Sequence, residues 1–113
     1  MTEPPFTASR EDRADRTVLR FGGELDATST DAVRATIAAA MDQATGRRLV
    51  LDLADVSFLD SSTIGTVLWA RDRSRKRNAA VSIVAPEGSR AARVLQLAGL
   101  GSVVPIVAAA DDD

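Results

Sequence analysis

One stretch of eight residues, Phe58 to Gly65, constrains the fold of this chain more than any other. It opens with the apolar pair Phe58-Leu59, continues with short oxygen-bearing side chains, and leads into an apolar helical pattern at Ile64, Val67 and Leu68. Asp and Ser are favoured where a helix starts, because their side-chain oxygens accept hydrogen bonds from its unpaired first amides. We therefore expect a strand that ends at Leu59, with Phe58 and Leu59 sealing the base of a site at the following helix start.

The chemistry of that helix start favours a negative charge. Ser61 and Ser62 are expected to stand at the N-terminus of the helix, with Ser61 as the capping residue. The aligned peptide dipoles of a helix make its N-terminal end partly positive, and the first amides are free to donate hydrogen bonds. A phosphate group on a serine at this position would be well accommodated.

Segments of strand and helix character alternate along the rest of the chain. The strands are expected at residues 6–9, 17–21, 48–53, 81–85 and 103–107. The helices are expected from Thr28 to Gly46, from the serine pair to about Asn78, and from Gly88-Ser89 to Gly99. A polar loop at 10–16, a strand break at Gly22-Gly23 and a short connection at 54–57 separate these elements. The alternation predicts an α/β fold with an initial hairpin and a largely parallel sheet.

Apolar spacing identifies the side chains that should form the core. For the first helix, with Thr28 and Asp31 as its capping pair, the buried face is predicted to contain Val33, Ile37, Met41 and Ala44. For the third helix, it is predicted to contain Ala91, Val94, Leu95 and Ala98. Gly46 and Gly99 are expected as C-terminal caps, Trp69 as partly buried core, and Pro105 as the mark of an edge strand.

Composition excludes several functions. The 113 residues are 45% hydrophobic, enough for one domain, and the formal charge of −2 gives no general attraction to nucleic acid or anionic lipid. Histidine and cysteine are absent, so imidazole catalysis, thiolate chemistry and the usual zinc ligands are excluded. We expect no enzyme activity, no cofactor and no metal. With no apolar run long enough to span a membrane, we expect a cytoplasmic protein that does not insert into membranes.

The end of the second helix is strongly basic. Five cations stand against Asp72 there: Arg71, Arg73, Arg75, Lys76 and Arg77. A nucleic-acid patch would be expected to carry interleaved aromatic residues, which this segment lacks. Cations suit the partly negative C-terminal end of a helix, and we adopt that interpretation.

Three segments together resemble the STAS domains of anti-sigma factor antagonists. Asp60-Ser61-Ser62-Thr63 is similar to the Asp-Ser-Ser-Gly of that family, Gly23-Glu24-Leu25-Asp26 to its Gly-x-Leu-Asp, and Pro86 with the helix ending at Gly99-Leu100 to its C-terminal segment. The resemblance implies a single STAS-like domain over residues 6–107, with a mixed, mostly parallel sheet and helices mainly on one face. Residues 1–5 would be a disordered N-terminus and residues 108–113 an acidic tail.

The resemblance also implies a function. The first serine of the motif is phosphorylated in the family, and that role falls on Ser61. The implied partner-binding residues are Asp26, Thr28, Asp60, Ser61, Ser62 and Thr63. The protein would capture an anti-sigma factor serine kinase and be switched off by phosphorylation, with a phosphatase as a further partner. For Asp26, a purely structural role in capping or bending the chain is an alternative.

Thr63 departs from the family pattern, because it stands where the motif has glycine. A β-branched residue there is expected to add bulk where glycine lets a kinase approach closely, and Thr63 could itself accept a phosphate. This departure supports an alternative function. The chain would then be a structural STAS subunit of a bacterial lipid-transport ABC system, with no serine switch.

Overall fold

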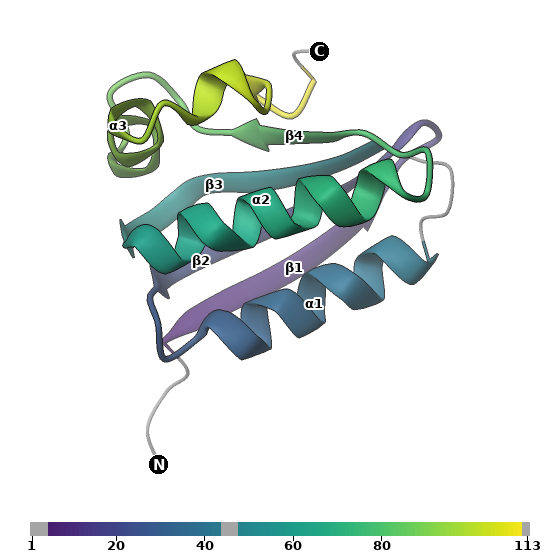
Figure 1. The fold of residues 1–113 in the computed structure, drawn as a ribbon, viewed down its shortest axis with the longest axis horizontal. Coiled ribbons are helices and arrows are strands. Elements are labelled where there is room, and N and C mark those ends of the chain that lie inside the picture. Colours follow the sequence, from purple (N-terminus) through teal and green to yellow (C-terminus); the bar gives the residue numbers. More distant parts are fainter. Residues whose placement is uncertain (1–4, 44–47, 112–113) are drawn as a thin grey trace.

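The computed structural model describes residues 5–43 and 48–111 of the chain. Within them the chain forms a mixed α/β fold with five strands and three α-helices (Figure 1). The elements are β1 (Phe6–Asp12), β2 (Arg16–Leu25), α1 (Thr30–Gln43), β3 (Arg48–Leu59), α2 (Ser61–Arg75), β4 (Val81–Val84), α3 (Arg90–Leu97), the 3-10 turn η1 (Leu100–Ser102) and β5 (Ile106–Val107). None of these helices has the length and apolar character needed to cross a membrane.

The strands form one sheet in the order β1-β2-β3-β4-β5. β1 and β2 make an antiparallel hairpin, whereas β2, β3, β4 and β5 are parallel to one another. The predicted mixed, mostly parallel sheet is thus confirmed. Because β2 and β3 are parallel, their carboxyl ends meet at the same edge, where Leu25 and Leu59 are register partners.

Two predicted interruptions of the strands are wrong. β2 continues through Gly22 and Gly23 to Leu25, and the pairing with β3 shifts register on both sides of this glycine pair. Gly23 has a φ of +86°, and a Cβ on it would lie 2.6 Å from the Pro5 carbonyl oxygen, so glycine permits an irregularity where we expected a break. Residues 54–57, expected as a connection, belong to β3, in which Val56 is buried.

The hairpin is longer than predicted at both ends. β1 extends to Asp12 because charged side chains of the expected polar loop pair across the hairpin, with Glu11 2.8 Å from both Arg13 and Arg20. Hydrogen bonds from Arg13 and then Arg20 hold the pKa of Glu11 below its usual value. Pro5, expected in a disordered N-terminus, accepts a hydrogen bond from the Glu24 amide over 2.8 Å.

All three helices contribute to one core against the same face of the sheet. Val33, Ile37 and Met41 are buried as predicted, together with Ala40, whereas Ala44 and Gly46 lie outside the described residues. Trp69 packs against this core. The α1 helix begins at Thr30, so the predicted Thr28–Asp31 capping pair is wrong.

The later elements are shorter than predicted. α2 ends at Arg75, and β5 is confined to the edge of the sheet after Pro105. Ser89 caps α3 by accepting a hydrogen bond from the Ala92 amide, and Gly99 is left-handed with a φ of +69°, as expected. Ala98 is exposed, and Ala92 is buried in its place.

The opposite face of the sheet carries a smaller apolar cluster, formed by Val18, Val50 and Val84. Ala110 of the C-terminal tail packs against it, and the Ala110 carbonyl oxygen accepts a hydrogen bond of 2.9 Å from Arg16. Asp111 forms an ion pair with Arg13. The described part of the tail therefore packs, through Ala110, against this cluster on the second face of the sheet.

Candidate functional site

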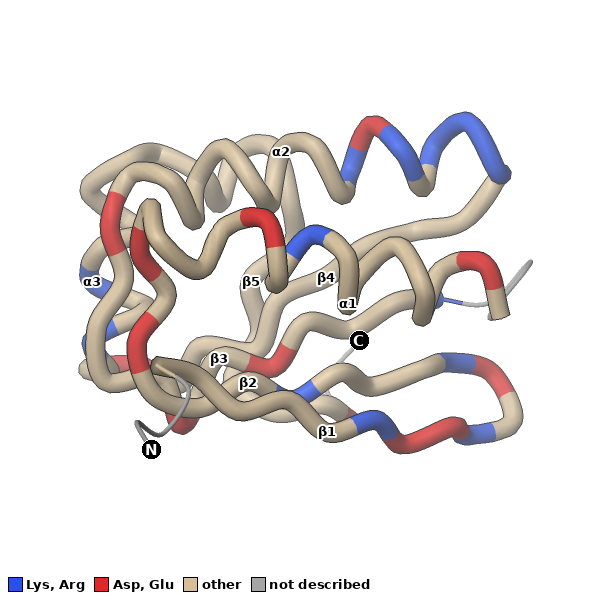
Figure 2. The backbone as a smooth tube through the Cα atoms, turned by 90° about the horizontal axis from the view of Figure 1, so that it is seen from below, with Lys and Arg blue, Asp and Glu red and all other residues tan. Residues whose placement is uncertain are grey.

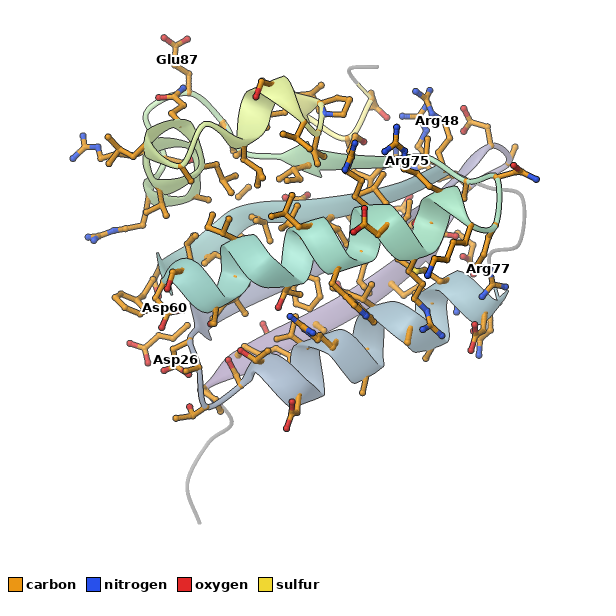
Figure 3. All side chains as sticks on the ribbon, in the orientation of Figure 1. Asp26, Arg48, Asp60, Arg75, Arg77 and Glu87 are labelled. Carbon is orange, nitrogen blue, oxygen red and sulfur yellow. The ribbon has the colours of Figure 1, made fainter. Side chains whose placement is uncertain are left out.

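The loops after β2 and β3 bring Asp26 and Asp60 to one edge of the sheet (Figure 3). The Leu25 carbonyl oxygen accepts two hydrogen bonds there, from the Asp60 amide at 3.3 Å and from the Thr63 hydroxyl at 3.1 Å. The end of β2 is therefore tied directly to the first turn of α2. The two sequence motifs that resemble the STAS family form one continuous surface.

Asp60, not Ser61, is the residue that caps α2. Its backbone is extended, with φ −122° and ψ −170°, and its Oδ1 accepts hydrogen bonds from the amide and the hydroxyl of Ser62. An aspartate at this position satisfies one of the unpaired amides of the first turn. Ser61 is thus the first residue of the helix, one place later than we expected.

The two serines have different environments. The Ser62 hydroxyl is committed to Asp60 Oδ1, and its side chain is partly buried. Ser61 is exposed, and no hydrogen bond to any described residue holds its hydroxyl. Of the two hydroxyl groups, that of Ser61 is therefore the one that is exposed and uncommitted among the described residues.

Thr63 points into the protein. Thr63 is 5% exposed, and its hydroxyl donates a hydrogen bond to the Leu25 carbonyl oxygen. The expectation that its β-branched side chain adds bulk to the surface is wrong, because the third residue of this helix faces the sheet. The Thr63 hydroxyl is therefore buried and committed to the Leu25 carbonyl oxygen.

Asp26 organises the turn between β2 and α1. Its Oδ1 accepts hydrogen bonds from the Thr28 hydroxyl at 2.6 Å, the Thr28 amide at 2.9 Å and the Ser29 amide at 3.2 Å. These bonds, above all that from the Thr28 hydroxyl, hold the pKa of Asp26 below its usual value although partial burial acts against them. The Asp26 carboxylate is therefore charged at neutral pH, and its hydrogen bonds with the exposed Thr28 hold the bend in the chain.

Sequence reasoning missed Ser29 and misplaced Phe58. Ser29 is buried, and its Oγ accepts a hydrogen bond of 3.0 Å from the Asp26 amide, which closes the turn; the run Thr28-Ser29-Thr30 was the available signal. Leu59 is buried as predicted, but Phe58 is 42% exposed. Phe58 thus presents an aromatic side chain beside the site instead of sealing its base.

The site lies at an acidic end of the molecule. Figure 2 shows acidic segments at the end of the sheet where the loops after β2 and β3 lie, whereas the last turns of α2 are mainly basic. Part of that basic cluster pairs with α1, since Arg77 and Arg73 lie 2.5 and 4.0 Å from Asp42. Within residues 5–43 and 48–111, no three side chains of the metal-binding types lie together.

The STAS domain family matches residues 7–112, and the chain belongs to this family. It is 37% identical over 84 residues to an anti-sigma F factor antagonist from Lysinibacillus sphaericus, covering 74% of this chain and 71% of that protein. An anti-sigma factor antagonist from Mycobacterium paratuberculosis superposes with a TM-score of 0.85 at 26% identity, over 99% of this chain and 94% of that one. The Bacillus cell fate determinant SpoIIAA in its phosphorylated form gives a TM-score of 0.61 at 26% identity, over 89% and 91%.

Proposed function

We propose that this protein is an anti-sigma factor antagonist that captures an anti-sigma factor kinase and is released by phosphorylation of Ser61. The observation that carries the proposal is the exposed, uncommitted Ser61 hydroxyl at the start of α2, beside the Asp26 turn. The names of the similar proteins support the same function. Phe58 and the two aspartates would form part of the surface that the partner recognises.

Phosphorylation requires no catalytic group from this chain. The partner kinase supplies ATP, magnesium and the catalytic base. A bond forms between Ser61 Oγ and the γ-phosphorus, the bond from that phosphorus to the oxygen that leaves with ADP breaks, and the hydroxyl proton passes to the base. A phosphatase would reverse the modification by hydrolysing the phosphate ester with water.

The added charge explains how the switch would work. A phosphate brings a charge of about −1.5 to −2 to a surface that already carries Asp26 and Asp60. The N-terminal end of α2 tolerates that charge, but a partner that fits the unmodified surface must then bury a phosphate against its own groups. A loss of about 3 kcal/mol in binding lowers affinity roughly a hundredfold, without any refolding.

Thr63 is buried and adds no bulk to the surface, and this supports the switching function over the structural-subunit alternative. A non-switching subunit of a lipid-transport system would be favoured if the test below found equal affinity for both phosphorylation states.

The test combines mass spectrometry with titration calorimetry. The protein is incubated with ATP, magnesium and the anti-sigma factor kinase encoded in the same genome, and the modified residue is located. We expect phosphate on Ser61, none in Ser61→Ala, and phosphate still on Ser61 in the matched control Ser62→Ala. The kinase should bind the unmodified protein and Ser61→Ala equally, and Ser61→Asp more weakly. Phosphate on another residue, or equal affinity for both phosphorylation states, would refute the proposal.

A further inference from the structure

Arg34 of α1 has no acidic partner among the described residues. Its Nε lies 3.4 Å from Thr66 Oγ1, and its Cζ lies 5.3 Å from the centroid of the Trp69 ring. Asp31, one turn earlier in α1, forms no ion pair with it. A guanidinium carries five donors in a planar fork that matches phosphate oxygens. Its contacts with Thr66 and Trp69 leave most of this donor capacity unused.

Gly65 provides open helix surface between Arg34 and Ser61. Gly65 follows Ser61 by four residues, so the two face the same side of α2 with their Cβ positions about 6 Å apart. A Cβ on Gly65 would meet only Nη2 of Arg34, at an ordinary contact distance of 3.7 Å. The fold therefore does not require glycine here, although glycine inside a helix costs about 1 kcal/mol relative to alanine. Its presence keeps the surface between the two residues clear.

We propose that Arg34 is the ligand of the phosphate on Ser61. This inference rests on the proposed function and adds to it a residue of the same chain that binds the phosphate. On phosphorylation, the guanidinium leaves the face of Trp69 and donates hydrogen bonds to the phosphate oxygens across Gly65. Trp69 then keeps only its second cation, Arg73, whose Cζ lies 5.7 Å from the ring centroid. The modification thereby changes the surface between α1 and α2 as well as its own position.

The first test measures the phosphate directly. Phosphoserine is incorporated at position 61 during translation, and the second pKa of its phosphate is followed by phosphorus NMR. A paired guanidinium stabilises the dianion, so Arg34→Gln should raise this pKa by about half a unit or more. Arg34→Lys should recover part of the shift, because lysine restores the charge but not the fork.

Arg73→Gln is the matched control. Arg73 also lies over Trp69, but it follows Ser61 by twelve residues, which places it about 18 Å further along the helix. The Arg73→Gln substitution should leave the pKa of the phosphate unchanged. An equal pKa in the parent and Arg34→Gln, or equal shifts in Arg34→Gln and Arg73→Gln, would overturn the assignment.

The second test uses Trp69, the only tryptophan of the chain, as a fluorescent reporter. Emission should differ between the phosphorylated and unmodified parent, and the same difference should remain in Arg73→Gln. It should disappear in Arg34→Gln, and its persistence there would refute the movement of Arg34. Because neither test uses a kinase or a partner, failure here concerns Arg34 alone, whereas the calorimetry above judges the proposed function.

Discussion

The Thr63 hydroxyl donates a hydrogen bond of 3.1 Å to the carbonyl oxygen of Leu25, and both residues are buried. The same carbonyl oxygen accepts the Asp60 amide at 3.3 Å. One acceptor at the end of β2 therefore fixes both the capping residue of α2 and the inward side of its first turn. The threonine that departs from the family motif is a structural element of the site.

Replacing Thr63 should consequently destabilise the protein. Thr63→Gly removes a buried hydrogen bond and places glycine in the first turn, so we expect a loss of about 1–3 kcal/mol in the free energy of unfolding. Thr63→Ser keeps the hydroxyl and should lose clearly less. Urea denaturation measures both variants. If glycine and serine cost the same, the hydrogen bond to Leu25 contributes nothing measurable.

Asp60 should matter for stability mainly through its acceptor atom, with a smaller contribution from its charge at the helix N-terminus. Asp60→Ala leaves the Ser62 amide without its partner and should cost about 0.5–2 kcal/mol, the usual range for a lost cap. Asp60→Asn retains an oxygen acceptor and should stay close to the parent. Thermal unfolding gives the stabilities, and hydrogen exchange of the Ser62 amide reports the local effect. Equal losses in the two variants would show that the negative charge is what stabilises this helix.

Phe58 and Leu59 should have opposite effects on stability and on partner binding. Leu59 is 4% exposed, and Leu59→Ala should cost about 2–5 kcal/mol in the free energy of unfolding, as for other buried leucines. Phe58→Ala should cost less than about 1 kcal/mol but weaken binding of the anti-sigma factor kinase, because exposed aromatic residues often anchor interfaces. Chemical denaturation and titration calorimetry separate the two effects. Unchanged affinity in Phe58→Ala would place this side chain outside the interface.

The Asp26 turn should weaken in acid. Thr28 and Ser29 hold the pKa of Asp26 below the ordinary 3.8, so its ionised form stabilises the folded state above that value, and the effect is lost as the pH falls through the lower folded value. Asp26→Asn keeps an oxygen acceptor but has no charge. The difference in stability between parent and variant should be constant from about pH 7 to pH 5 and shrink below about pH 4. Denaturation at several pH values tests this, and a difference that keeps its full neutral-pH size as the pH is lowered from about 5 to 2 would contradict it.

The sequence predicted the order of the elements and most of the core, because these depend on periodicity and on start and stop signals. Val33, Ile37 and Met41 follow helical spacing, and Ser89 and Gly99 mark the ends of α3. Boundaries that depend on tertiary contacts were missed.

The glycine pair stays in β2 because β3 runs alongside it through a shift of register. The charged residues after Ser9 extend β1 because they pair with the opposite strand.

At the site, the position of Ser61 at the start of a helix was predictable, whereas the inward orientation of Thr63 was not. Residue type indicates that Asp, Ser and Thr favour a helix start, but it does not say which of them faces the sheet. That depends on where β2 ends, and the Leu25 carbonyl oxygen lies within reach of Thr63 only because the two strands end in register.

The anchoring of both loops to Leu25 has a consequence for the rate of association. A surface whose two halves share one hydrogen-bond acceptor is already formed before a partner arrives, so no slow rearrangement has to precede or follow the encounter. Complex formation should then follow a single exponential whose rate rises linearly with partner concentration. Phosphorylation would act chiefly by shortening the lifetime of the complex, since related complexes differ mostly in their dissociation rates. In the cell, release of the partner would then be limited by the dissociation rate of the complex and not by a folding step.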